Sequence, residues 1–135
     1  MVTLIVVDSN IWIFAAREAA PEHELALKKI EELLLKSKVA TNSVVVSEVF
    51  HKLFVLHSAA QAKRKVDAIL DHPLISWMTL TRGTASRAIS LAEREGLRIN
   101  DALIAQQALE NKAAILTDDV GDFRKVKGLK VMGLR

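Results

Sequence analysis

Apolar positions along the chain alternate between short continuous runs and longer stretches with helical spacing. The stretch Val2–Asn10 reads VTLIVVDSN, and its apolar, β-branched run is typical of a strand buried on both faces of a parallel sheet. Four shorter apolar segments that suit further strands follow at 39–41, 74–80, 113–117 and 129–132. Each segment is too short to be assigned by periodicity alone, so its place between helical patterns supports the assignment.

Between these runs, apolar residues recur every three or four positions, as in Ala26, Ile30 and Leu33. This spacing predicts amphipathic helices. The predicted helices cover residues 11–16, 21–36, 42–57, 59–70, 84–95 and 100–111. Gly96 is expected to close the fifth of these helices in a left-handed conformation, with Leu97 packing back on it. Strands that alternate with helices indicate an α/β fold built of βαβ units with right-handed crossovers.

Composition narrows the class of protein. The 135 residues suit one domain spanning 1–135, half of them are hydrophobic, and no uncharged apolar run approaches the ~18 residues of a membrane span. The chain contains no cysteine, which excludes thiolate zinc sites and cysteine nucleophiles. With no signal-peptide pattern either, we expect a cytoplasmic protein.

The net charge gives only weak evidence about the partner of the protein. The formal net charge is +3, from 19 lysines and arginines against 16 acids, which alone argues only faintly for a polyanionic partner. If several of the acids were gathered in one pocket, the remaining surface would be distinctly basic and would attract phosphates.

Acidic residues fall where the predicted strands end and the following helices begin. Asp8 ends the first strand, Glu48 lies early in the helix after the second, and Asp101 starts the helix before the fourth. After the fourth strand come Asp118, Asp119 and Asp122. Because ligands of parallel α/β sheets bind outside the carboxyl ends of the strands, these acids are expected at one edge of the molecule.

Each acid also has an ordinary structural explanation. Asp8 and Asp101 suit helix N-caps, and Glu48 could pair with Lys52 one turn on. The aspartates after the fourth strand could be turn residues. If all of these explanations held, the acids would share one edge of the sheet only by coincidence. A cluster that cations hold together is the more persuasive explanation, since gathered carboxylates otherwise repel one another. Oxygen ligands alone suit Mg²⁺ or Mn²⁺, and such ions support phosphodiester hydrolysis.

Four segments carry a family resemblance: VVDSN at Val6–Asn10, SEV at Ser47–Val49, RINDALIAQQA at Arg98–Ala108 and ILTDDVGDF at Ile115–Phe123. With these motifs in this order and spacing, the chain resembles a PIN domain, and specifically a single-domain toxin of the VapC type. The resemblance implies a three-layer α/β/α sandwich with a central parallel sheet of about five strands. It also implies a metal-dependent endoribonuclease, the toxin of a type II toxin–antitoxin pair.

The resemblance assigns roles to individual residues. Asp8, Glu48 and Asp101 match the first three family acids, and Asp119 the fourth, so these four are the expected catalytic residues and metal ligands. Asp122 is a further candidate ligand that could exchange importance with Asp119. Thr117, Ser9 and Asn10 are expected to orient the carboxylates by hydrogen bonds. Arg82, Arg98, Arg124 and Lys125 are candidates for holding the RNA backbone, although each could equally be a solvated surface charge.

The expected partners are an RNA substrate, an antitoxin protein and a second copy of the chain in a homodimer, with no membrane. Apolar residues of the first two helices, including Ile11, Trp12, Phe14 and Leu33–Leu35, are candidates for contact surface or, more simply, for core. Two other functions compete. The fold could be a catalytically silent RNA-binding or protein-interaction module, or a phosphoacceptor domain like signalling receivers. The latter carry an acidic pair after the first strand, where this chain has one aspartate.

Overall fold

The computed structural model describes residues 2–135 and contains one five-stranded parallel sheet. Its strands are β1 (Leu4–Val7), β2 (Lys38–Thr41), β3 (Ile75–Trp77), β4 (Ala114–Thr117) and β5 (Val131–Gly133). They lie in the order β3-β2-β1-β4-β5, and every neighbouring pair is parallel. In the register, Val6 of β1 stands between Ala40 of β2 and Ile115 of β4. The α/β fold class and the parallel sheet of five strands are therefore confirmed.

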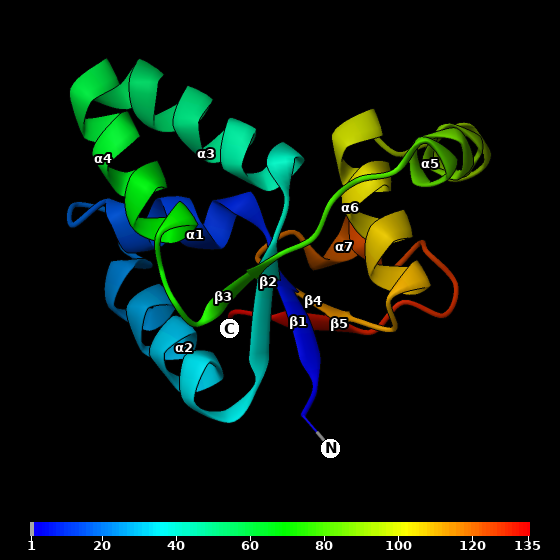
Figure 1. Cartoon of the computed structure of the whole chain (residues 1–135), viewed down its shortest axis with the longest axis horizontal. Helices are drawn as coiled ribbons and strands as arrows, with labels where there is room; N and C mark the ends of the chain where they lie inside the picture. Colours follow the sequence, from blue (N-terminus) through cyan, green and yellow to red (C-terminus); the bar gives the residue numbers. More distant parts are fainter. Residues whose placement is uncertain (1) are drawn as a thin grey trace.

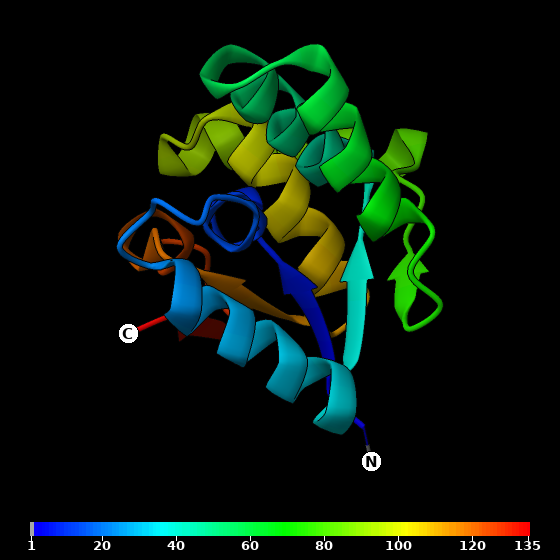
Figure 2. The ribbon, with the colours of Figure 1, turned by 90° about the vertical axis from the view of Figure 1, so that its left-hand side faces the viewer.

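Helices connect the strands and cover both faces of the sheet. They are α1 (Ser9–Ala16), α2 (His23–Lys36), α3 (Ser43–Leu56), α4 (Ala59–Leu70), α5 (Arg82–Glu95), α6 (Ile99–Glu110) and the short α7 (Val120–Phe123). Figure 1 shows α1 and α2 on one side of the strands and α5 and α6 on the other. Turned by 90°, Figure 2 shows α3 and α4 stacked beyond the end of the sheet at which the strand arrows point. None of the described helices is long and apolar enough to span a membrane.

The central strands are buried because helices pack on both faces. Val6, Val7, Ile115 and Leu116 are fully buried, which explains why β1 and β4 read as continuous apolar runs. Of the candidate contact residues in the first two helices, Ile11, Trp12 and Leu33 lie in the core. Leu35 is exposed.

Most helix ends agree with the sequence. Asn42 caps α3 by accepting a hydrogen bond from the backbone N–H of Val45 at 2.9 Å. Gly96 closes α5 at φ 68°, and the buried Leu97 donates its N–H to the carbonyl of Ala92. These two ends follow the capping chemistry that the sequence predicts.

Four predicted boundaries were wrong. Helix α5 begins at Arg82, two residues before the predicted start at Thr84, because the side chain of Thr81 caps it. The residue that precedes α6 is Arg98, which places Asn100 and Asp101 inside the first turn rather than at the cap. Strand β3 spans only Ile75–Trp77, the three residues in register with β2, and the last strand is shifted to Val131–Gly133.

Candidate active site

Asp8 combines the two roles that the sequence left open. It follows β1 and precedes α1, where its Oδ1 accepts a hydrogen bond from the N–H of Ser9 at 2.8 Å. Its side chain is nevertheless buried. Burial raises the pKa of Asp8 to about 6, the hydrogen bonds from Thr117 and Ser9 lower it, and the charges of Asp101 and Glu48 raise it further. Because the charges of Asp101 and Glu48 act on its pKa, this capping carboxyl group also lies near two of the other predicted acids.

Thr117 is the hydrogen-bonding centre of this part of the site. Its hydroxyl donates to Oδ2 of Asp8 at 2.7 Å and accepts from the backbone N–H of Asp119 at 3.0 Å. The side-chain amide of Asn10 also donates to it, at 3.4 Å, while the Asn10 carbonyl oxygen accepts from the N–H of Asp118 at 3.3 Å. The end of β4 is thereby tied to the end of β1, and the orientation of Asp8 is fixed.

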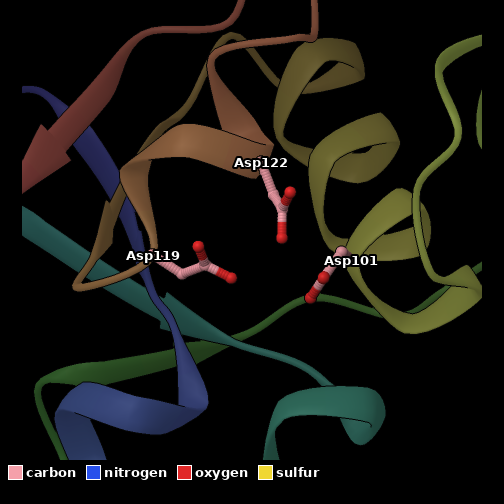
Figure 3. Close-up of side chains that lie close together, drawn as sticks. All are labelled: Asp101, Asp119 and Asp122. Carbon is pink, nitrogen blue, oxygen red and sulfur yellow. The ribbon is translucent and has the colours of Figure 1, made fainter.

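Three aspartates from two segments meet beside α6. One carboxylate oxygen from each of Asp101, Asp119 and Asp122 lies within 4.8 Å of the other two. In Figure 3, Asp101 extends from α6 toward the loop and short helix that carry Asp119 and Asp122. Both candidates for the fourth acid therefore point into the same cluster, and α7 is the reason: it turns Asp122 back toward Asp119 where the sequence predicted only turns.

Asp101 has an unusual hydrogen-bonding state. Its Oδ2 is buried and has no hydrogen-bond partner among the described residues, since Nε of Arg98 stays 3.6 Å away. Burial raises the pKa of Asp101, the charge of Arg98 opposes this, and the charges of Glu48 and Asp122 add to the increase. This buried oxygen lacks a hydrogen bond within residues 2–135 and faces only the ion-pairing Arg98, so a bound cation would complete its interactions.

The other two acids of the cluster are more exposed. Burial, followed by the neighbouring Asp122, raises the pKa of Asp119. Asp122 faces Nζ of Lys125 at 3.4 Å. The charge of Asp122 therefore disfavours ionisation of Asp119 unless a cation joins them.

Glu48 lies on α3 at the edge of an open hollow of about 480 Å³ whose lining includes Ser9, Lys52 and Arg98. Its Oε2 accepts a hydrogen bond from the side-chain amide of Asn100 at 3.4 Å. No ion pair between Glu48 and Lys52 forms within residues 2–135. The charge of Glu48 acts on both Asp8 and Asp101, which places it beside the cluster.

Asp118 stands apart from the other acids. Both of its oxygens accept from Arg135, at 3.1 and 3.2 Å, and the same guanidinium group binds Glu22 at 3.0 Å. Asp118 therefore anchors the loop to the end of the chain, as one of the turn residues that the sequence allowed.

The sequence analysis missed a buried amide pair behind the site. The side-chain amide of Asn42 donates to Oε1 of Gln107 at 2.8 Å, and the Gln107 amide donates to the carbonyl of Met78 at 3.2 Å. Both side chains are almost fully buried. The pair joins the start of α3, which carries Glu48, to α6, which carries Asp101. The only signal in the sequence was a polar residue on the otherwise apolar face of α6.

Two of the basic residues proposed to hold RNA are engaged with the acids instead: Arg98 faces Asp101 and Lys125 faces Asp122. Arg82 and Arg124 form no ion pair within residues 2–135.

The donor set fits a hard divalent cation. It consists only of carboxylates, three of them with raised pKa values, and it contains a buried carboxylate oxygen that accepts no hydrogen bond within residues 2–135. Mg²⁺ and Mn²⁺ prefer such oxygen ligands and retain several waters. An acidic cluster that could bind metal is thus present at Asp101, Asp119 and Asp122.

Comparison with known proteins gives consistent results. The chain matches the family described as PIN domain over residues 5–129. Similar solved structures include VapBC2 from Rickettsia felis bound to a promoter DNA fragment (TM-score 0.76, 20% identity, covering 97% of this chain and 98% of that one). They also include DNA-bound VapBC from Salmonella typhimurium (0.77, 13%, 100% and 100%). A third is VapC20 of Mycobacterium tuberculosis, titled a sarcin-ricin loop cleaving toxin (0.75, 16%, 85% and 91%). No curated protein matches by sequence. At these identities the solved structures show a shared fold.

Proposed function

The chain belongs to the PIN domain family, and from this premise we propose that it is a metal-dependent endoribonuclease, the toxin of a type II toxin–antitoxin pair acting in the cytoplasm. The observation that carries the proposal is the buried Oδ2 of Asp101, which lies in a carboxylate cluster and accepts no hydrogen bond within residues 2–135, its ion pair with Arg98 spanning 3.6 Å. Folding a protein around such a group costs free energy, and binding a divalent cation would offset that cost.

Asp8, Asp101 and Asp119 are the proposed principal ligands, with Glu48 and Asp122 completing the pocket. Mg²⁺ or Mn²⁺ bound there would supply a water of lowered pKa and charge stabilisation at the phosphodiester. The protein itself orients the carboxylates. Thr117 holds one oxygen of Asp8 at 2.7 Å, so that the other groups meet a carboxylate of fixed orientation.

Two residues hold the remaining carboxylates. Asn100 donates to Glu48 and keeps it at the open side of the site. Arg98, 79% exposed in its side chain and 3.6 Å from Asp101, can leave that carboxylate and meet a phosphate when RNA arrives.

Cleavage of RNA with and without Mn²⁺, by the parent protein and by Asp8→Asn, tests the proposal. We expect metal-dependent cutting by the parent and a loss of at least 100-fold in the variant, because the central carboxylate is removed. Equal cleavage by both proteins would contradict it. Sequencing of RNA ends after brief expression, compared with the Asp8→Asn control, would identify the target.

Binding of Mn²⁺ can be measured separately by calorimetry on purified protein. We expect binding by the parent and weakened binding by Asp101→Asn. No binding to the parent would favour a catalytically silent RNA-binding or protein-interaction module instead.

The proposed partners are an antitoxin and a second copy of the chain. Solved structures of the same fold include VapBC complexes, and a further one from Klebsiella pneumoniae is described as a toxin–antitoxin complex. Co-purification with the product of an adjacent gene, and loss of RNA cleavage in that complex, would support the antitoxin.

A further inference from the structure

A second hollow, of about 370 Å³, lies between the end of α1, the last turns of α3 and the first turns of α4. Its polar lining consists of Arg17, Arg64, Lys65, His57, Gln61 and one acid, Glu18. Figure 2 views the molecule from the side on which these three helix ends meet. The hollow shares no lining residue with the acidic cluster or with the hollow beside Glu48.

The cations of this hollow are not neutralised. Within residues 2–135, no ion pair involves Arg17, Arg64 or Lys65. Nε of Arg17 is buried and has no hydrogen-bond partner. By contrast, Arg98 is paired with Asp101 and Arg135 with Asp118. Like charges that share a concave surface repel one another, so a bound anion would relieve that repulsion.

The lengths of helices α1 and α3 indicate how far this hollow lies from the carboxylates. Asp8 caps the start of α1 and Arg17 caps its end. Glu48 lies near the start of α3 and His57 follows its last residue. Each pair is nine positions apart, which corresponds to about 13 Å along a helix. An extended single strand spans this length in a few nucleotides, while the helices keep the two positions fixed.

We propose that the Arg17–Arg64–Lys65 hollow binds a phosphate group of the RNA substrate a few nucleotides away from the cleaved bond. The assignment rests on the proposed ribonuclease function and adds the position of a second backbone contact. Arginine suits this role because its guanidinium group binds phosphate in a bidentate manner, and Gln61 supplies a neutral donor beside it. The acidic cluster itself repels phosphates in the absence of metal, so an anchoring cationic site at a distance would favour the productive position of the strand.

The test compares the double variant Arg17→Gln/Arg64→Gln with the parent and with Lys112→Gln/Lys130→Gln. The latter pair removes the same charge from a different hollow, next to Thr3 at the amino end of the sheet. Binding of a fluorescent single-stranded RNA is measured by anisotropy in EDTA, where cleavage does not interfere. We expect the Arg17/Arg64 variant to bind about tenfold more weakly at low salt, with a slope of log K against log salt that is shallower by about 0.7 for one lost phosphate contact. The control pair is expected to stay within twofold.

A substrate series locates the contact. Single phosphates within four linkages of the cleavage site are replaced, one at a time, by neutral methylphosphonates. At one position we expect the replacement to raise the KM of the parent by the same factor of about ten, with kcat unchanged. The same replacement should not raise the KM of the variant any further. Titration with inorganic phosphate should shift the NMR amide signals of Gln61 and Arg64 in the parent but not in the variant.

The outcomes separate this proposal from the ribonuclease function. Equal RNA affinity and salt slope for the parent and a correctly folded Arg17/Arg64 variant would overturn the phosphate site, as would binding of inorganic phosphate without any effect on RNA. If the variant kept its RNA affinity but lost binding to polyglutamate, the hollow would belong to an acidic protein partner instead. RNA binding that depends on Arg17 and Arg64, without any cleavage in Mn²⁺, would contradict the ribonuclease and support the anion site.

Discussion

Thr117 shows how much of the candidate site depends on one neutral side chain. The residue is fully buried, and its hydroxyl connects Asp8 with the backbone of Asp119 and with Asn10. The proton of the hydroxyl goes to Asp8, so its lone pairs are free to accept from the other two groups. Such a centre positions carboxylates without adding charge of its own.

We expect Thr117→Val to reduce RNA cleavage by about 10- to 100-fold, the usual effect of losing a group that orients a metal ligand. Valine keeps the shape but leaves Asp8 and the N–H of Asp119 without their partner, which should also lower the free energy of unfolding by about 1–3 kcal/mol. Cleavage rates and urea unfolding measure the two effects. Thr117→Ser, which keeps the hydroxyl, should retain most of both, and parent-like cleavage by Thr117→Val would contradict this role.

The raised pKa of Asp8 predicts how stability depends on pH. Because this pKa is about 6 in the folded protein against an ordinary value of 3.8, the folded state keeps a proton that the unfolded state releases between these values. The folded state then binds more protons, so the contribution of Asp8 to stability falls as pH rises from about 4 to about 6. Without metal, the total loss is on the order of 3 kcal/mol.

The difference in unfolding free energy between Asp8→Asn and the parent isolates this contribution. In EDTA we expect the difference to move in favour of the variant as pH rises through that window and to level off near neutrality. Added Mn²⁺ should stabilise the parent more than the variant, since the proposed ligand is then ionised and occupied. A difference that does not change between pH 4 and pH 7 would show that Asp8 titrates normally.

At the scale of elements, the sequence predicted the strands and helices well where the pattern is strong. The apolar runs of β1 and β4 and the spacing in α2 and α4 leave few alternatives, because their residues pack on both faces or along one stripe. Asn42 caps α3, as the sequence predicted, and Ser58 caps α4 directly before its predicted start. The start of α6 was not, because Arg98 makes no capping bond and only tertiary packing fixes that end.

The candidate site, like the secondary structure, could be predicted only in part. The acids could be named from the sequence because each stands at a strand end or in the first turns of a helix. Their mutual arrangement could not, since it depends on α7 and on the direction in which Asp118 and Asp122 turn. The Asn42–Gln107 pair was also beyond reach, because a contact between residues 65 positions apart leaves no local pattern.

Gln107→Leu tests whether this buried pair holds α3 and α6 in place. We expect a loss of about 1–3 kcal/mol in unfolding free energy, because the amide of Asn42 and the carbonyl of Met78 would be left unpaired in the interior. Chemical denaturation measures the loss. The neighbouring Gln106→Leu, which breaks a bond at the surface to Glu110, should cost less than half as much, and equal losses would argue against a special role of the pair.

At the scale of the whole molecule, the parallel topology explains why residues so distant in sequence form one site. Every strand points the same way, so the ends of β1 and β4 deliver Asp8 and Thr117 to the same edge. The helices that follow or approach this edge add Glu48 and Asp101. Arg17 at the end of α1, together with Arg64 and Lys65 of α4, lines a separate hollow, to which the proposed phosphate contact is assigned.

The proposed homodimer follows from an apolar patch on α3 that the fold leaves uncovered. Phe50 and Phe54 stack with ring centroids 6.0 Å apart, yet they are 38% and 50% exposed, and the adjacent Val55 is 65% exposed. A stacked aromatic pair on the surface is typical of an interface core.

We expect the parent to sediment as a dimer and Phe50→Ser/Phe54→Ser to sediment as a folded monomer, because the contact loses its largest apolar groups. Leu35→Ser removes an apolar side chain of α2 that is still more exposed, at 85%, and should leave the dimer intact. A monomeric parent would contradict the homodimer, and a dimeric double variant would place the interface on another face.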